Sequence, residues 1–148
     1  MQKVIYIVLL LMNSILSAGS YDSEKAVKNG DVINMHGPIY NFARFEEFME
    51  DVNKGDTAEV RITNYALDGN PTLYNVNFDG SVFNLEVDRS KNKNRGDNPK
   101  KTRLSCDNLA KEVGEQIYSY TLKDCQQSTN DRFTLLNILK EQEDDHEH

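Results

Sequence analysis

The chain has 148 residues, with 24 acidic and 17 basic side chains and a formal net charge of −7 at pH 7. Its length suits one domain with a modest core. The acidity argues against nucleic acid or an anionic lipid surface as a partner, because both need clustered lysine and arginine. The one basic run, Lys91–Lys101, is interleaved with Asn, Gly, Asp and Pro and has no aromatic residue to stack on bases, so a solvated loop is predicted there.

Residues 1–20 have the pattern of a secretory signal peptide. After a positively charged start, an apolar run extends from Val4 to Met12, and small residues surround an expected cleavage point after Ala18 or Ser20. The run is broken at Asn13 and is shorter than the roughly 20 apolar residues of a spanning helix. We therefore expect cleavage, ahead of the alternative of a signal helix retained as an anchor, with no membrane span after cleavage and a secreted protein on the extracellular side of the membrane.

The remaining chain is expected to form one α+β domain over residues 21–140, followed by a disordered acidic tail at 141–148. His146 and His148 lie among carboxylates in that tail and could bind a divalent cation weakly. A metal site needs preorganised geometry, which a mobile terminus lacks. No metal site and no cofactor are predicted.

Two helices are predicted in the first third of the domain. Ser23–Lys28 can form a short helix, capped by Asp22 or Ser23 and stopped at Asn29-Gly30, with a short extended piece at Val32–Met35 after it. Asn41 is predicted to cap a stronger helix that ends at Gly55. Its apolar residues recur at three- and four-residue spacing, and they are Phe42, Phe45, Phe48, Met49 and Val52. This stripe is expected to face the core rather than a ligand.

The centre of the chain predicts an antiparallel β-meander that the second helix covers. Alternating apolar residues mark three strands, with Ala58, Val60 and Ile62, then Tyr74, Val76 and Phe78, then Phe83, Leu85 and Val87. A two-residue turn at Asp79-Gly80 would pair Val76 with Phe83 and Tyr74 with Leu85. A three-residue loop at Asp68–Asn70 would pair Ile62 with Val76 and Val60 with Phe78, which keeps all apolar side chains on one face.

The C-terminal third gives weaker signals. After a polar surface loop at 89–101, we expect an extended Thr102–Ser105, a helical Asp107–Val113 and a strand at Gln116–Leu122. Phe133–Leu139 fits a strand or a helix, and the strand is favoured slightly.

Cys106 and Cys125 are the only cysteines, and in an exported chain they are expected to form one structural disulfide. Closing a loop of this length stabilises the fold by roughly 3 kcal/mol. A redox pair would more often have Cys-x-x-Cys spacing, and a zinc site would need two further ligands.

Several short motifs stand in a characteristic order. They are Asn29-Gly30-Asp31-Val32, His36-Gly37, Asn41, Phe45, Phe48, Arg61-Ile62-Thr63, Asp68-Gly69-Asn70-Pro71, Asp79-Gly80 and the two cysteines. Together they resemble the small exported or lipoprotein-like bacterial proteins, largely from Gram-positive species, that are grouped as domain of unknown function 4362. The resemblance runs from about Tyr21 to Leu139. It implies a compact domain outside the membrane and brings no activity, substrate or catalytic residue. Family members are often lipoproteins, but Ser20 stands here about where the lipid-accepting cysteine would be.

Enzyme signatures are absent from the sequence. There is no Gly-x-Ser-x-Gly elbow, phosphate-binding glycine loop or His-Glu-x-x-His, and Arg95 occupies a position where a calcium loop needs an oxygen ligand. His36 with Ser23 or Asp31 could in principle form a general base, but a structural histidine beside a Gly-Pro turn is favoured.

Two further motifs have simpler interpretations. Arg95-Gly96-Asp97 matches a tripeptide that animal cell-surface receptors bind, yet the loop composition alone explains it. Five tyrosines could form an interface, although packing in the core and on the sheet is favoured; they are Tyr40, Tyr65, Tyr74, Tyr118 and Tyr120.

These observations favour a non-enzymatic, monomeric binding or accessory module at the cell envelope. Its partner would be an extracellular protein, a peptide or a wall component, which the sequence does not identify. The alternatives are a secreted enzyme inhibitor, or a cell-envelope hydrolase that uses paired carboxylates drawn from Asp31, Glu59, Asp79 and Glu86.

Overall fold

The computed structural model describes residues 21–126 and 129–141. The predicted signal peptide, and with it Ala18 and Ser20, lies outside the described residues, as does the predicted acidic tail apart from Glu141. In the described part of the chain, no helix is long and apolar enough to cross a membrane.

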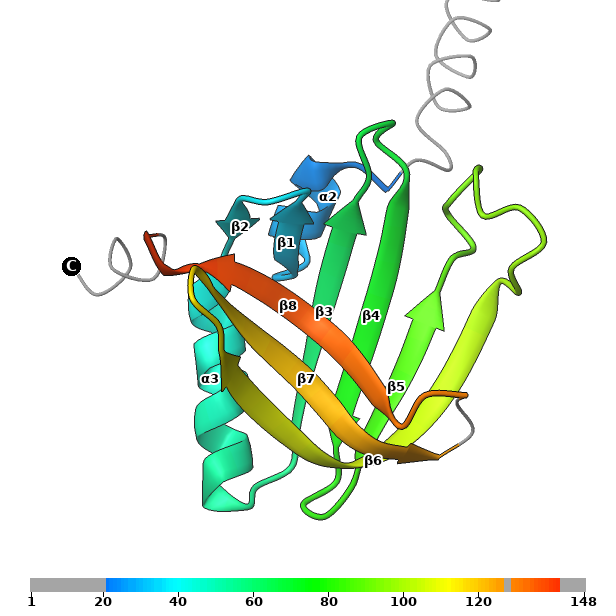
Figure 1. The fold of residues 1–148 in the computed structure, drawn as a ribbon. Coiled ribbons are helices and arrows are strands. Elements are labelled where there is room, and N and C mark those ends of the chain that lie inside the picture. Colours follow the sequence, from blue (N-terminus) through cyan, green and yellow to red (C-terminus); the bar gives the residue numbers. More distant parts are fainter. Residues whose placement is uncertain (1–20, 127–128, 142–148) are drawn as a thin grey trace, which may run out of the picture.

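The described chain forms an eight-stranded sheet that curls until it is nearly closed, with a long helix beside the gap (Figure 1). The elements are α2 (Ser23–Lys28), β1 (Val32–Met35), β2 (Ile39–Tyr40), α3 (Phe42–Lys54), β3 (Ala58–Tyr65), β4 (Pro71–Phe78), β5 (Phe83–Asp88), β6 (Lys101–Val113), β7 (Ile117–Gln126) and β8 (Arg132–Leu139). The strand order is β2-β1-β3-β4-β5-β6-β7-β8. β1 pairs with β3 in parallel, and the other neighbours are antiparallel.

This architecture confirms the predicted mixture of helices and strands with one disulfide. It differs from the predicted simple meander because the sheet has more strands and bends back on itself. A strongly twisted sheet of this size can bury its apolar face by curling, and the helix then needs to cover only the remaining gap.

The first helix, α2, begins as expected at Asp22, whose Oδ1 accepts a hydrogen bond of 2.9 Å from the backbone N–H of Lys25. It ends at Asn29, and Gly30 then takes the left-handed φ of 78° that turns the chain into β1. Both this helix and the strand Val32–Met35 were predicted correctly.

The second helix, α3, buries Phe42, Phe45 and Phe48, which confirms that its apolar stripe faces the core. It ends at Gly55 as predicted, where a left-handed φ of 76° lets the Gly55 N–H bond to the carbonyl of Val52. The helix also begins after Asn41 as predicted, but the Asn41 side chain does not cap it. Asn41 precedes the helix without a side-chain capping bond, and its amide donates to the carbonyl of Asp31 instead.

Helix α3 closes the core by touching both halves of the curled sheet. The Phe45 and Phe42 rings lie 4.9 Å and 6.2 Å from the ring of Tyr120 on β7, measured between centroids. The same helix packs against β1 and β3. The three phenylalanines therefore join the first strands of the sheet to one of the last, and the gap between the sheet ends is filled by rings.

The predicted register of the β4–β5 hairpin is wrong by two residues. Phe78 lies opposite Phe83, and Val76 lies opposite Leu85. The turn is longer than predicted because the Asp79 carboxylate accepts hydrogen bonds from the backbone N–H groups of Ser81 and Val82, which adds these residues to the loop. The predicted apolar faces are nevertheless correct, since a shift of two residues leaves each side chain on the same side of the sheet.

The β3–β4 register is also wrong by two residues. Ile62 lies opposite Tyr74, and Val60 lies opposite Val76. The Ala66 N–H bonds to the carbonyl of Asn70, so the connection spans five residues rather than the predicted three. Again the apolar side chains stay on the inner face.

The predicted helix at Asp107–Val113 is wrong, because this segment is the second half of the long strand β6. Its residues pair in register with β7, with Leu109 opposite Leu122 and Val113 opposite Tyr118. Cross-strand pairing along a continuous ladder outweighs the weak local helix preference. The favoured strand at Phe133–Leu139 is confirmed, and a bulge opposite Tyr120 and Thr121 allows neighbouring Leu135 and Leu136 both to be buried.

The predicted disulfide is confirmed. Cys106 on β6 and Cys125 on β7 lie directly opposite each other, and both are buried in the core. The bond closes the ladder at the end of the β6–β7 hairpin.

Candidate functional site

The outward side of strands β3 to β6 carries a continuous set of polar side chains. Because apolar residues at alternate positions face the core, the positions between them point outwards. We call this set the polar face, and it consists of Glu59, Arg61, Asn75, Asn77, Asn84, Glu86, Arg103 and Ser105.

The register arranges the polar face in two rows across the strands. One row runs through Glu59, Asn77, Asn84 and Ser105. The other runs through Arg61, Asn75, Glu86 and Arg103. Neighbouring strands lie about 4.8 Å apart, so the rows form a dense array of amide, carboxylate and guanidinium groups on a rigid support.

A shallow groove of about 770 Å³ lies over this array. Residues 29–31, which connect α2 to β1, border it together with Arg44 of α3. The apolar residues that also border the groove are Val60, Val76, Leu85 and Leu104, and all four are buried in the core. The side chains that point outwards over the groove are therefore polar, and apolar surface is exposed between them.

Ion pairs hold part of the polar face in place. Arg103 donates to Oε2 of Glu86 from Nε at 3.1 Å and from Nη2 at 3.0 Å. Lys101 lies 3.4 Å from the other oxygen of Glu86 and 3.9 Å from Asp88. At the opposite side of the groove, Arg44 donates to the backbone carbonyl of Glu59. These exposed pairs orient the side chains but stabilise the fold only slightly.

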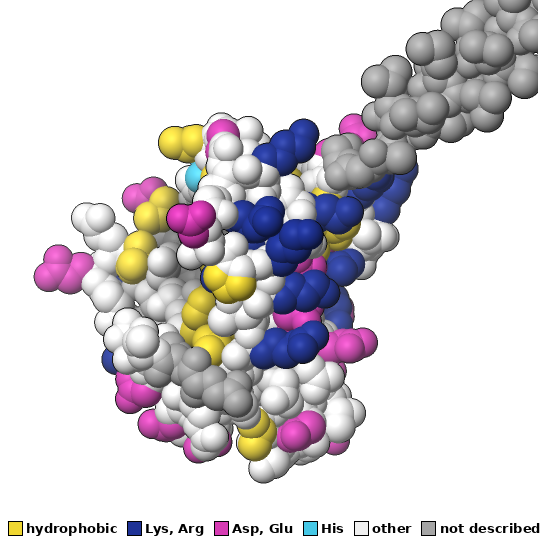
Figure 2. Space-filling model, turned by 90° about the vertical axis from the view of Figure 1, so that its right-hand side faces the viewer, with side chains coloured by type: hydrophobic (Ala, Val, Ile, Leu, Met, Phe, Trp, Pro, Cys, Tyr) yellow, Lys and Arg dark blue, Asp and Glu magenta, His cyan; other side chains and the backbone are white. Residues whose placement is uncertain are grey.

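Basic side chains gather on the side of the molecule that carries β5, β6 and the loop between them, with acidic side chains among them (Figure 2). The predicted loop over the basic run is confirmed, since no helix or strand forms between Arg89 and Lys100. Asn94 donates to the Asp68 carboxylate, and Asn70 accepts from the Lys93 N–H, so this loop is tied to the β3–β4 connection.

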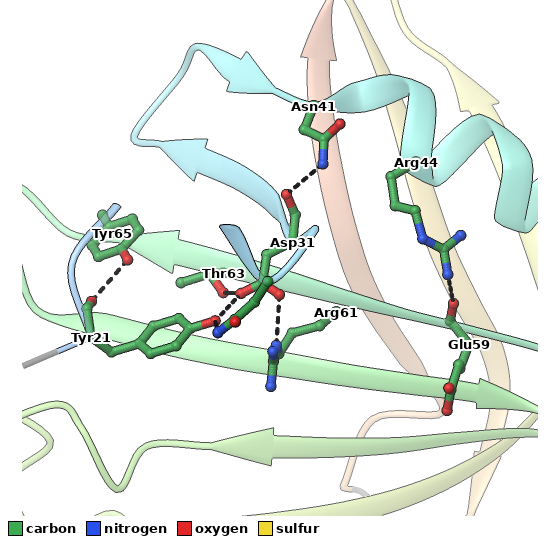
Figure 3. Close-up of polar contacts among 9 residues, drawn as sticks. Tyr21, Asp31, Asn41, Arg44, Glu59, Arg61, Thr63 and Tyr65 are labelled. Atoms are coloured by element: carbon green, nitrogen blue, oxygen red, sulfur yellow. Dashed lines mark hydrogen bonds and ion pairs between the residues drawn. The ribbon is translucent and has the colours of Figure 1, made fainter. Parts of the chain in front are cut away.

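A buried carboxylate lies at the edge of the groove, where α2 passes into β1 (Figure 3). Asp31 is 1% exposed. Its Oδ1 accepts from Arg61 Nε at 2.8 Å, and its Oδ2 accepts from Thr63 Oγ1 at 2.8 Å and from the Tyr21 hydroxyl. The Tyr65 hydroxyl donates to the backbone carbonyl of Tyr21 at 2.8 Å. We call these five residues the Asp31 network.

The pKa values of Tyr21, Tyr65 and Arg61 are consistent with the hydrogen bonds of the Asp31 network. Burial, together with the hydrogen bond to Asp31, raises the pKa of Tyr21. Burial and the nearby Tyr21, Asp22 and Asp31 raise the pKa of Tyr65 to about 12. Burial alone would lower the pKa of Arg61, but the hydrogen bond and charge of Asp31 raise it. Both phenols thus stay protonated at neutral pH, and the network acts as a structural tie.

The structure brings some of the candidate catalytic acids to the groove. Glu59 and Glu86 belong to the polar face, and Asp31 lies at its border with both oxygens already bonded. Asp79 lies in the β4–β5 turn, where the backbone N–H groups of Val82 and Ser81 lower its pKa. Within the described residues, no group of three or more ligating side chains could hold a metal.

The remaining sequence candidates occupy simple structural positions. His36 has a left-handed φ of 44° and its Nδ1 lies 3.3 Å from the Tyr65 carbonyl, so it belongs to the turn after β1, consistent with the favoured structural interpretation. Arg95-Gly96-Asp97 lies in the tied loop, with Asp97 exposed. Among the tyrosines, Tyr65 and Tyr120 are buried as favoured, while Tyr40 is 55% exposed. His146 and His148 lie outside the described residues.

The polar face and the Asp31 network were not predicted as sites. A signal for the polar face exists in the sequence, because Asn75, Asn77, Asn84 and Glu86 occupy the polar positions of two alternating strands. No comparable signal exists for the network, whose acid and arginine are 30 positions apart.

The fold and groove define a small mixed α/β protein with a nearly closed, disulfide-bonded sheet and a polar outer face. The family model described as Domain of unknown function (DUF4362) matches residues 29–121, more than half of the chain, and the protein belongs to this family. The match covers the whole polar face and confirms the resemblance seen in the motifs. Neither a curated protein nor a solved structure matches the chain.

Proposed function

We propose that this protein is a secreted, non-enzymatic binding module of the cell envelope and that the polar face is its ligand-binding surface. The ligand would be a wall component rich in hydroxyl and amide groups. Export is supported by the N-terminal signal pattern and by the disulfide, because disulfides persist mainly in oxidising compartments.

The unpaired amides of the polar face are the observation that carries this proposal. Asn75, Asn77 and Asn84 lie on adjacent strands and make no side-chain hydrogen bond to another described residue. Each amide offers two N–H donors and one carbonyl acceptor. A cluster of such groups on a rigid sheet is complementary to a polymer that presents alternating donors and acceptors, such as the sugar hydroxyls and stem-peptide amides of a bacterial wall.

The charges around the groove support binding over hydrolysis. A hydrolase of this kind needs one carboxyl group with a raised pKa as its acid. Glu86 instead accepts from Arg103 and lies 3.4 Å from Lys101, so both of its oxygens are already engaged by cations. In the described residues, every side-chain carboxyl group with a shifted pKa has a lowered pKa. These groups belong to Asp68, Asp79, Asp88 and Glu112.

Co-sedimentation of the oxidised protein with purified peptidoglycan tests the proposal. We expect the wild type to pellet with the wall material and a triple N75A, N77A, N84A variant to bind at least about tenfold more weakly, since several hydrogen bonds are lost. Asn53→Ala, on the exposed side of α3, is the matched control and should bind as the wild type does.

Two outcomes would overturn the proposal. One is the absence of wild-type binding to wall material, and the other is equal binding by the triple variant when its melting temperature shows that it is folded. Release of soluble wall fragments during the incubation would point to the hydrolase instead.

A further inference from the structure

A second pocket lies on the other side of the sheet from the polar face, and we propose that it binds a small organic carboxylate with an apolar body. The pocket has a volume of about 320 Å³. It is bordered by the ends of β3 and β5, the start of β4 and the start of β8, through Asn64, Tyr65, Ala66, Asn70, Thr72, Tyr74, Val87, Arg89 and Phe133. Pockets for small ligands often lie at the mouths of curled sheets.

Strand register places this pocket on the inner side of the sheet. Tyr74 pairs with Ile62 on one side and with Val87 on the other, and Ile62 and Val87 are core residues. Asn64 and Thr72 are two positions away from Ile62 and Tyr74, so they share that inner side. The pocket is therefore the end of the core that α3 does not fill, and it is separate from the groove over the polar face.

One wall of the pocket is aromatic. The rings of Tyr74 and Phe133 meet edge to face, with 5.0 Å between their centroids and 80° between their planes. Burial raises the pKa of Tyr74, which keeps its hydroxyl protonated. This wall offers dispersion contacts and one hydroxyl to the body of a ligand.

One residue that borders the pocket has a buried N–H donor without a partner in the described residues. Asn64 accepts a 3.0 Å hydrogen bond from Asn34 through Oδ1, which fixes the orientation of its amide. Its Nδ2 is buried and bonds to nothing in the described residues. Leaving such a group unsatisfied is destabilising, and a bound acceptor would remove that cost.

A fixed positive charge completes the pocket. Arg89 donates from Nη1 to Thr102 Oγ1 at 2.9 Å and to the Pro99 carbonyl at 3.4 Å, so its guanidinium is held in place. It forms no ion pair with a carboxylate of the described chain. Its charge reaches the Tyr74 hydroxyl, whose pKa it lowers against the larger effect of burial.

These three features select the class of ligand. The guanidinium and the amide N–H are both donors, and a carboxylate offers two acceptor oxygens in the plane that such donors prefer. The aromatic wall needs an apolar group attached to that carboxylate. Inorganic phosphate would leave the wall unused, and a neutral aromatic would leave the two donors unsatisfied.

Titration with benzoate, followed by the NMR signals of the Asn64 side-chain amide and the Phe133 ring, tests this proposal. We expect saturable shifts with a Kd of about 1 mM or tighter. Benzyl alcohol and inorganic phosphate should each bind at least about tenfold more weakly, since benzyl alcohol lacks the carboxylate and phosphate lacks the apolar body.

Variants separate this pocket from the rest of the molecule. Arg89→Gln should weaken benzoate binding at least about tenfold, and Arg89→Lys, which keeps the charge, should have a smaller effect. Lys54→Gln, at the exposed end of α3 and outside both pockets, is the control and should leave binding unchanged. The proposal fails if benzoate causes no saturable shift up to about 20 mM, or if benzyl alcohol or phosphate binds equally well. It also fails if folded Arg89→Gln binds like the wild type.

Discussion

Asp31 and Arg61 form a charged hydrogen bond of 2.8 Å between Oδ1 and Nε, which fastens the start of β1 to the middle of β3. The carboxylate is 1% exposed, whereas the arginine side chain remains 35% exposed. The acid is thus the more sensitive partner, because its replacement leaves three donors around it without an acceptor of full charge.

Asp31→Asn should lower the free energy of unfolding by about 2 to 4 kcal/mol, since it weakens several hydrogen bonds to a buried charge at once. Urea unfolding followed by circular dichroism measures this difference. Glu46→Gln removes an exposed carboxylate from α3 and should change stability by less than about 0.5 kcal/mol. Equal effects of the two substitutions would show that the Asp31 network contributes nothing.

Reduction of the Cys106–Cys125 bond should lower the free energy of unfolding by about 3 kcal/mol, because the reduced chain gains conformational freedom when unfolded. Urea unfolding with and without dithiothreitol measures the loss. The double variant C106A, C125A should resemble the reduced wild type and should not respond to dithiothreitol. If reduction leaves the wild-type midpoint unchanged, the bond is not a structural tie.

Stability should fall at alkaline pH because of Tyr65. Its pKa is about 12 in the folded protein against an ordinary 10.0, so folding favours the protonated phenol. The stabilisation is complete below pH 10 and is lost as the pH rises towards 12, by about 1 to 2 kcal/mol. Urea unfolding at a series of pH values measures the decline.

Tyr65→Phe should be less stable than the wild type at pH 8, because the hydrogen bond to the Tyr21 carbonyl is lost. Its deficit should shrink as the pH rises, since the variant has no phenol to titrate at that position. Tyr40→Phe, at a tyrosine that is 55% exposed, is the control and should follow the wild type at every pH. Parallel pH curves for wild type and Tyr65→Phe would refute the assignment to Tyr65.

Phe45→Ala should lower the free energy of unfolding by about 3 to 5 kcal/mol, because Phe45 is fully buried and joins α3 to Tyr120 across the gap in the sheet. Val27→Ala, at a side chain on α2 that is 56% exposed, should cost less than about 1 kcal/mol. Chemical denaturation compares the two. Similar losses would mean that α3 does not close the core.

The sequence allowed the helices and most strands to be predicted, because their signals are local. The stripe from Phe42 to Phe48 and the stop at Gly55 lie within one helix, and the alternation in β3, β4 and β5 fixes which side chains face inwards. The disulfide followed from the cysteine number together with the expected export of the chain.

Features that depend on distant contacts could not be predicted. The β4–β5 register failed because the Asp79 carboxylate lengthens a turn that looks like a two-residue hairpin, and the β3–β4 register failed because the connection spans five residues. The helix expected at Asp107–Val113 failed because the β7 partner strand decides its conformation. The parallel position of β1 beside β3 places Asp31 next to Arg61, and the sequence around neither residue indicates this pairing.

The parallel β1–β3 ladder also sets an order of assembly. Synthesis delivers β1 before α3 and β3, so until the chain has grown well past it this strand can pair only with the two-residue strand β2. The antiparallel hairpins from β3 onwards can form from neighbouring segments as they emerge. Strand β1 is therefore expected to join the sheet late, after the hairpins formed by later residues.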